Sequence, residues 1–252
     1  MRSLVVSVTA VVLCLACGGG EGGGADETGG GDAAATAALG TASIGGTVLF
    51  TGTPPSNPSI DMSEEEACRA KYPSAPTDPQ VVVSNGRLGN VFIRVTGGLP
   101  AGAAFPRPAA PASVNQDGCL YHPRVLGVMV GQSFEIRNSD PVLHNIKAVP
   151  TQNRGFNISQ PQAGMTTTRT FSTPEIMVPL ECNVHGWMNA FVGVVDHPFF
   201  ATSGEDGTFT ISGLPAGTYQ LEAWHERFGT RTGSVTVADG ATGTVEFTFT
   251  AN

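Results

Sequence analysis

The chain has 252 residues, of which only 13% are charged, and its formal net charge is −8. This length leaves room for one large or two modest domains, and the acidic balance argues against a nucleic-acid-binding protein, which would carry a basic patch. The sequence has no run of 18 apolar residues, so we expect no ordinary membrane-spanning helix. Val, Thr, Gly and Pro are plentiful and long amphipathic periods are missing, which favours an all-β chain of short strands.

The first 17 residues have the layout of a secretory signal. An Arg near the start precedes an apolar stretch from Leu4 to Leu15, and a small residue stands before Cys17. Segment 1–17 resembles a bacterial lipoprotein signal, which implies export to the periplasm or cell envelope and lipidation of Cys17. Cys14 stands where that pattern has an aliphatic residue, so a simple cleaved signal is the alternative. The Gly- and Ala-rich residues 18–42 are then expected to form a disordered tether.

Between the tether and residue 111 the sequence predicts few regular elements. Ser63 and Glu66 have capping-box spacing, which predicts the opening of a short helix. Asn85-Gly86 is typical of a tight hairpin turn. We expect a strand over 42–52, a helix opening over 61–66, a hairpin formed by 81–84 and 88–95, and a Pro/Ala-rich connection over 99–111.

Short strands follow at the spacing typical of a β-sandwich. We expect them over 125–130, 133–138, 145–149, 166–171, 176–180 and 190–195.

The segment 200–252 differs in style. Leu214-Pro215-Ala216-Gly217-Thr218-Tyr219 puts turn residues between two alternating strands. This segment resembles the carboxypeptidase-regulatory, transthyretin-like β-sandwich of exported bacterial proteins, whose opening strands look like residues 44–48 and 88–95. We therefore expect one of two arrangements: a transthyretin-like sandwich made of 43–98 and 200–252 with another domain inserted, or two sandwiches in series.

Three cysteines remain beyond the signal: Cys68, Cys119 and Cys182. In an oxidising compartment an odd count leaves one thiol free or bound to a metal. By elimination we expect a Cys68–Cys119 disulfide, with Cys182 as the odd cysteine.

Two short segments carry the chemistry of a metal site. One places His144 at the end of a loop between two predicted strands, and the other packs Cys182, His185 and Met188 into seven residues. Thiolate and thioether are soft ligands, and two His with one Cys and a weak Met define a blue-copper site. The sequence therefore predicts one copper ion.

The spacing Cys182-x2-His185-x2-Met188 resembles that of the cupredoxins, in particular the amicyanin branch, over residues 112–197. The resemblance implies a Greek-key sandwich in which His144, Cys182, His185 and Met188 bind a type 1 copper ion. It also implies that Asn145 joins the two ligand loops by a hydrogen bond. Asn183 stands where Ser or Thr is usual, which affects the tuning of the site.

The same resemblance implies how an electron would leave. The ring of His185 is expected to break the surface, surrounded by an apolar docking rim. The expected rim residues are Pro141, Val142, Leu143, Gly186 and Trp187.

The function we expect is an envelope-tethered electron carrier whose partner is a c-type cytochrome or a membrane oxidoreductase. Two alternatives remain: a periplasmic copper-binding or delivery protein without redox role, and a cell-surface interaction module. We do not expect an enzyme, because copper enzymes need further His clusters and this chain has five His in all.

Overall fold

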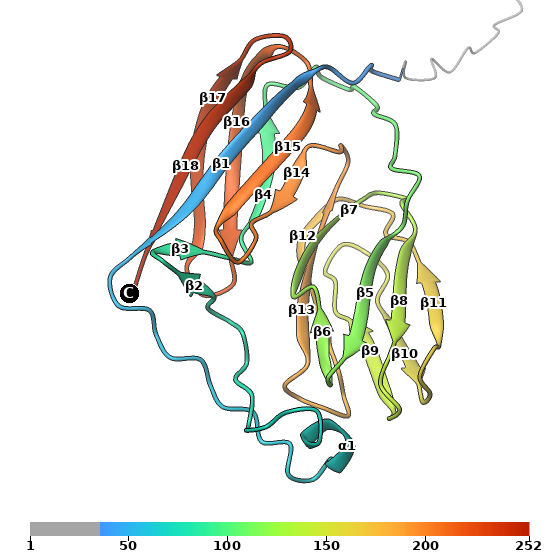
Figure 1. Cartoon of the computed structure of the whole chain (residues 1–252). Helices are drawn as coiled ribbons and strands as arrows, with labels where there is room; N and C mark the ends of the chain where they lie inside the picture. The colour runs from blue at the N-terminus through green and yellow to red at the C-terminus, as the bar shows by residue number, and fades with distance from the viewer. Residues whose placement is uncertain (1–35, 252) are drawn as a thin grey trace, which may run out of the picture. The chain divides into compact units, whose positions relative to one another are not determined.

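The computed structural model describes residues 36–251, and these residues form an all-β structure with one short helix, in agreement with the predicted fold class (Figure 1). The predicted signal 1–17 with Cys17, and residues 18–35 of the predicted tether, lie outside the described residues. Within the described part, no helix has the length and apolar character needed to cross a membrane.

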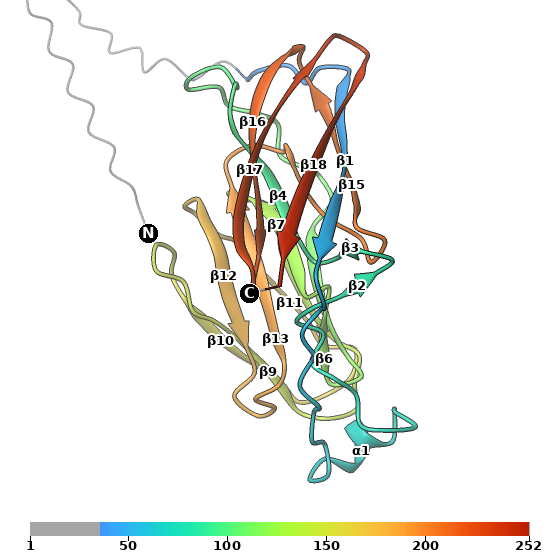
Figure 2. The same ribbon diagram turned by 90° about the vertical axis from the view of Figure 1, so that its left-hand side faces the viewer.

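A first sandwich consists of a five-stranded and a four-stranded sheet. One sheet has the order β15 (Thr208–Leu214), β1 (Ala42–Thr51), β3 (Arg87–Leu88) and β2 (Val83–Ser84), with β18 (Thr242–Thr250) paired to β1. The other has the order β14 (Phe200–Thr202), β4 (Phe92–Gly97), β16 (Gly217–His225) and β17 (Gly229–Val237). Figure 1 shows β1 running between β18 and β15, and Figure 2 gives the same strands turned by 90°.

The core of the first sandwich follows from period-two alternation along its strands. In β16 the side chains of Tyr219, Leu221 and Ala223 are buried while their neighbours are not. They belong to one apolar cluster with Ile44 of β1 and Phe247 of β18. Since successive strand residues point to opposite faces, this alternation turns one apolar face of each sheet inward.

A second sandwich also has a five-stranded and a four-stranded sheet. The larger sheet has the order β10 (Phe156–Gln160), β9 (His144–Ala148), β12 (Glu175–Glu181), β13 (Asn189–Val195) and β7 (Val125–Met129). The smaller sheet has the order β11 (Thr166–Arg169), β8 (Phe134–Asn138), β5 (Ala112–Asp117) and β6 (Leu120–His122).

The strands of the first sandwich come from both sides of the second in the sequence. β1 pairs with β15 and β18, and β4 pairs with β14 and β16. The sequence left two arrangements open, an inserted domain or two sandwiches in series. An insertion requires the strand pairing that is observed. The limits 43–98, 112–197 and 200–252 themselves stay a prediction.

The two sandwiches share a buried junction. Phe92, Val125 and Val195 form a small apolar cluster there, and Phe191 packs edge-on against Trp224 with ring centroids 5.2 Å apart. A buried ion-pair network lies beside it: Arg124 of the second sandwich pairs with Glu226, which follows β16, and with Asp78 at 2.6 Å.

Residues 59–77 form a loop that we call the cover loop. An isolated bridge between Ser59 and Thr77 closes its base, and it contains the helix α1 (Glu66–Arg69). Ile60 and Met62 are buried in the core of the second sandwich. The cover loop is therefore part of that core's packing.

A disulfide fastens the cover loop to the second sandwich. It joins Cys68 to Cys119, the two cysteines expected to pair, with their Cα atoms 5.6 Å apart. Nearby, the Tyr72 hydroxyl donates to the Gly118 carbonyl at 2.7 Å. Cys182 is left as the one free cysteine among the described residues.

Three expected elements are wrong in their limits. The helix begins only at Glu66, the last residue of the expected opening 61–66, and no side chain caps it, so the predicted Ser63 cap is absent. The expected strand 88–95 is split, because Asn90 has a positive φ of 58° that turns the chain from one sheet to the other. Residues 36–42 of the expected tether are ordered: the Ala37 N–H donates to Ala104 and the Gly40 N–H to Gly213.

The predicted hairpin turn is present. Asn85 and Gly86 both have positive φ, 51° and 71°, between β2 and β3. This is the type I′ geometry that an Asn-Gly pair favours, because both central residues of the turn need φ above zero.

Candidate metal centre

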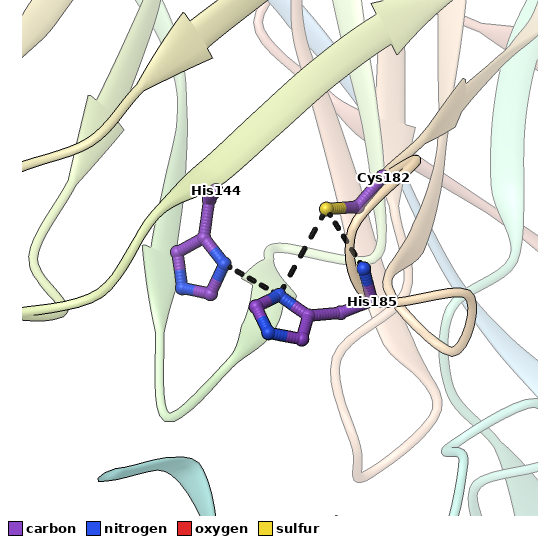
Figure 3. Close-up of side chains that lie close together, drawn as sticks. All are labelled: His144, Cys182 and His185. Carbon is purple, nitrogen blue, oxygen red and sulfur yellow. Dashed lines mark hydrogen bonds between the residues drawn. The ribbon is translucent and has the colours of Figure 1, made fainter. Parts of the chain in front are cut away.

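Three potential ligands converge at one end of the second sandwich. His144 is the first residue of β9, Cys182 follows β12 directly, and His185 lies in the short loop before β13. All three side chains are buried, and their ligand atoms lie within 4.8 Å of one another. Figure 3 shows the two imidazole rings and the sulfur pointing toward one common space.

In both histidine rings, Nδ1 is the nitrogen that faces the other ring. Nδ1 of His144 lies 2.9 Å from Nδ1 of His185, and Nδ1 of His185 lies 4.0 Å from Sγ of Cys182. The backbone N–H of His185 also donates to this sulfur at 3.3 Å. The centre therefore offers two imidazole nitrogens and one sulfur at short mutual distances.

A tight loop places the fourth predicted ligand. The Cys182 N–H donates to the Met188 carbonyl at 3.2 Å, and the Met188 N–H donates to the His185 carbonyl at 2.9 Å. These two bonds fold residues 182–188 into a compact turn. The Met188 side chain is fully buried in the same cluster as Cys182.

Asn145 joins the two ligand loops. Its Oδ1 accepts a hydrogen bond from the Asn183 N–H at 2.6 Å and lies 3.4 Å from Sγ of Cys182. This is the cross-link that the cupredoxin resemblance implies. Asn183 contributes through its backbone, so the side chain at this unusual position is not part of the link.

The far side of the His144 ring contacts a buried carboxylate. Nε2 of His144 lies 2.9 Å from Oδ2 of Asp140, and Asp140 also accepts from the Gly118 and Cys119 N–H groups at 3.0 and 2.7 Å. Lys71 of the cover loop forms an ion pair with the same carboxylate. A carboxylate behind a ligand His fixes the ring's orientation and tautomer, and here it leaves Nδ1 facing the centre.

The electrostatics of the centre favour a thiolate. Burial alone raises the pKa of the Cys182 thiol, but hydrogen bonds from both histidines and from the backbone outweigh it and lower the pKa to about 5. Burial lowers the pKa of His144, yet its bonds to Asp140 and Cys182 raise it more. For Asp140 the cost of burial is outweighed by His144, Lys71 and Cys119, so its pKa lies below the usual range.

This donor set fits copper. A thiolate, two imidazoles and a buried thioether nearby are the ligand types of a blue-copper site, and a thiolate is the form of Cys that binds metals. Cys119 also lies within 4.8 Å of Asp140 and His144. Its sulfur is in the disulfide, so it is not a thiolate ligand.

One expectation about the centre is wrong. The ring of His185 was expected to break the surface, but His185 is only 3% exposed. The cover loop lies over it, with Glu65 Oε2 3.7 Å from Nε2 of His185. The cupredoxin resemblance could not predict the burial of His185, because the resemblance covers residues 112–197 and the cover loop precedes them.

The five residues of the expected docking rim differ in their exposure. Leu143 is 44% exposed, and Pro141 and Gly186 are exposed as well. Val142 and Trp187 pack partly against the core, and the Trp187 indole donates to the Cys119 carbonyl at 3.0 Å. That these five residues form a docking rim stays a prediction.

Three residues beside the ligands were missed: Asp140, Lys71 and Glu65. Asp140 stands four residues before His144, a signal that could have suggested a partner for its ring. Lys71 and Glu65 come from a segment far from the ligands in the sequence. No local pattern indicates that it lies there.

One family model matches part of the described chain. Residues 188–250 match the model of the carboxypeptidase regulatory-like domain, and no curated protein matches the chain. The model's range starts one residue before β13 of the second sandwich and includes that strand, and it leaves out β1 and β4, which complete the first sandwich.

Several solved structures are similar to part of the chain. A copper-containing nitrite reductase from Thermus scotoductus is 23% identical, with a TM-score of 0.30 over 39% of this chain and 25% of its own. A purple cupredoxin from Nitrosopumilus maritimus is 22% identical, with a TM-score of 0.29 over 33% of this chain and 98% of its own. A Cu(I) amicyanin variant is 18% identical, with a TM-score of 0.30 over 42% of this chain and 98% of its own.

The chain thus spans a quarter of the length of the nitrite reductase. The described chain thus combines a β-sandwich that holds the His144–Cys182–His185 cluster with a stretch that matches the carboxypeptidase regulatory-like domain.

Proposed function

We propose that this protein is a type 1 copper electron carrier. The observation that carries the proposal is the convergence of His144, Cys182 and His185 within 4.8 Å, with Met188 buried in the same cluster. When bound, copper would supply a one-electron couple between Cu(I) and Cu(II).

The surroundings of the ligands suit such a role. Asn145 ties the two ligand loops together, and Asp140 holds the His144 ring from behind. A site whose ligands are fixed by outer hydrogen bonds and by packing changes little when the charge of its ion changes. Small reorganisation favours fast electron exchange.

We also propose that the chain is exported and lipid-anchored at Cys17, in the periplasm or cell envelope. The Cys68–Cys119 disulfide supports export, because disulfides persist in oxidising compartments. A c-type cytochrome or a membrane oxidoreductase is the partner class that we propose.

The test is copper titration of the full exported chain, followed by visible spectroscopy and voltammetry. We expect an intense blue Cu(II) form with a reversible one-electron couple, and no such colour in Cys182→Ala. A colourless Cu(I) complex without a reversible couple would instead support copper delivery. An unchanged spectrum in Cys182→Ala would exclude Cys182 as a ligand.

A further inference from the structure

The four predicted ligands are shielded from solvent. His144 and Met188 are fully buried, and His185 and Cys182 are only 3% and 4% exposed. A metal ion has no open path to ligand atoms that are buried to this extent. A segment that covers them must therefore move before an ion can enter or leave.

The cover loop is the segment whose position allows this movement. A cavity of about 340 Å³ separates it from the ligand loop 182–188, and His185 lines this cavity opposite Glu64 and Glu65. Glu65 Oε2 lies 3.7 Å from Nε2 of His185, a distance too long for a hydrogen bond. The cover loop thus shields the His185 ring without packing tightly on it, so little contact is lost when the loop moves away.

The cover loop is also connected to the other imidazole ligand. Lys71 of the loop forms an ion pair with Asp140, and Asp140 Oδ2 lies 2.9 Å from Nε2 of His144. Movement of the loop therefore changes the surroundings of both ligand histidines. The position of the loop and the state of the metal centre are coupled through these contacts.

Few contacts other than its disulfide hold the cover loop closed. Its buried side chains are Ile60, Met62 and Cys68, and most of its other residues are exposed. Segments with few buried contacts open locally at a low cost in free energy, and a covalent cross-link removes the open conformations of such a loop. The Cys68–Cys119 bond is therefore expected to determine how often the loop opens.

The disulfide joins the cover loop to the surroundings of the metal centre. The Cys119 N–H donates to Asp140 at 2.7 Å, and the Cys119 carbonyl accepts the Trp187 indole N–H at 3.0 Å. Cys68 and Cys119 are only 0% and 1% exposed. Because thiol–disulfide exchange needs access to the sulfur atoms, the bond must form while the loop is open, and it is protected once the loop has closed.

We propose that the cover loop is a lid over the metal centre, and that the Cys68–Cys119 disulfide locks this lid after the metal ion has entered. The ion binds to the dithiol form of the chain, and oxidation of the two thiols then retains it. The oxidant is a thiol oxidoreductase that carries a disulfide. Cys68 and Cys119 lose two protons and two electrons as their S–S bond forms, and the disulfide of the oxidoreductase breaks and becomes a dithiol. This inference rests on the metal-binding part of the proposed function and does not depend on electron transfer.

The first test measures metal uptake by the metal-free, full exported chain. One sample keeps the disulfide, and a second sample is reduced and then freed of reductant under nitrogen. Co(II) is the probe, because it does not oxidise thiols and its bond to a thiolate absorbs in the near ultraviolet. We expect the reduced chain to take up Co(II), and to release it to a chelator, at least about tenfold faster than the oxidised chain.

The matched variant is Cys68→Ser with Cys119→Ser. It unlocks the lid and removes both thiols, so its Co(II) absorbance reports on the predicted centre rather than on Cys68 or Cys119. Its rates should equal those of the reduced chain, and treatment with reductant should leave them unchanged. The comparison of the oxidised and reduced chains needs no substitution, so it stands even if the variant does not fold.

A second measurement uses no metal. Diethyl pyrocarbonate modifies accessible imidazole rings, and mass spectrometry of peptides locates the modified residue. We expect the modification of His185 in the metal-free chain to rise about tenfold on reduction. His197 is the internal control, because it is buried, its Nε2 lies 2.9 Å from the Val95 carbonyl oxygen, and it has no contact with the cover loop. An equal rise at both histidines would show general loosening of the fold and would overturn the lid.

Failure of the lock and failure of the metal centre give different results. If Co(II) binds at the same rate with and without the disulfide, the centre stands and the lock alone is wrong. If neither Co(II) nor Cu(I) binds to any form of the chain, the proposed metal centre is wrong and the lock with it.

Discussion

The two sandwiches have similar sheets but differ in what they bury. The first has a largely apolar core, and the buried polar residues on or against its strands include Ser203, His225 and His197, whose Nε2 lies 2.9 Å from the Val95 carbonyl oxygen of β4. The second buries a set of polar side chains toward the ligand end, among them Asn138, Asp140, His144, Asn145 and Gln160. Buried polar groups add little stability unless fully bonded, so their concentration in one sandwich marks where the chemistry lies.

The hydrogen bonds of these polar side chains explain how they are tolerated. Asn138 donates to the Val142 and Gln160 carbonyls at 3.0 and 2.9 Å, and its Oδ1 accepts the Asp140 N–H at 2.9 Å. This network shapes the loop that precedes His144. One sandwich therefore provides packing and the other provides positioned ligands.

The largest stability effect is expected where the two sandwiches meet. Arg124→Met removes the buried partner of Glu226 and Asp78, whose carboxylates are then left unpaired. Loss of one member of a buried ion pair costs about 3–5 kcal/mol, measured as the free energy of unfolding in urea. If the visible spectrum of the copper-loaded variant is unchanged, the junction serves stability alone.

Asp140→Asn tests the polar network of the second sandwich. The variant weakens the contact behind His144, and loss of such outer contacts typically lowers metal affinity about 10- to 100-fold. Competition with a copper chelator measures the change. Asn115→Ser, in the same sandwich but bonded only to Ser139 at 2.8 Å, is the control and is expected to keep its affinity.

The buried His225 is expected to make the stability of the first sandwich depend on pH. Burial, with Arg124 and Arg227 nearby, lowers the pKa of His225 to about 4, against 6.5 in the unfolded chain. Because the unfolded state binds the proton more readily, this group removes stability as the pH falls from about 6.5 to about 4. Unfolding curves of the protein and of His225→Phe should differ in slope across that window; parallel curves would contradict the lowered pKa.

The smallest expected effect concerns the turn that identified the first sandwich. The Tyr219 hydroxyl donates to the Pro215 carbonyl at 2.7 Å. Tyr219→Phe removes this bond while the ring stays buried, at a cost of about 1 kcal/mol. Thermal unfolding measures it, and the copper spectrum should not change.

Sequence reasoning succeeded where the pattern is local. The Asn85-Gly86 turn and the 182–188 loop are short segments whose spacing determines their geometry. The insertion could be inferred only as one of two arrangements, because the pairing of β1 with β18 joins segments far apart in the chain.

The cover loop shows what sequence alone could not supply. Its short helix has no capping side chain, and its place depends on buried Ile60 and Met62 and on a disulfide to the second sandwich. These are tertiary contacts without a local signature. The burial of His185 therefore could not be foreseen from the ligand motif.

The parallel pairing of β1 with β18 has a consequence for the order of folding. Ser43 pairs with Thr242 and Thr51 with Thr250. The sheet that contains β1, the first strand of the chain, is therefore complete only when β18, the last strand, has paired with it. Contacts of such long sequence separation form slowly, whereas the strands from β5 to β13 are contiguous and are complete sooner. In a refolding experiment, the ligand-bearing sandwich should gain its near-ultraviolet signal before the sandwich that surrounds it in sequence.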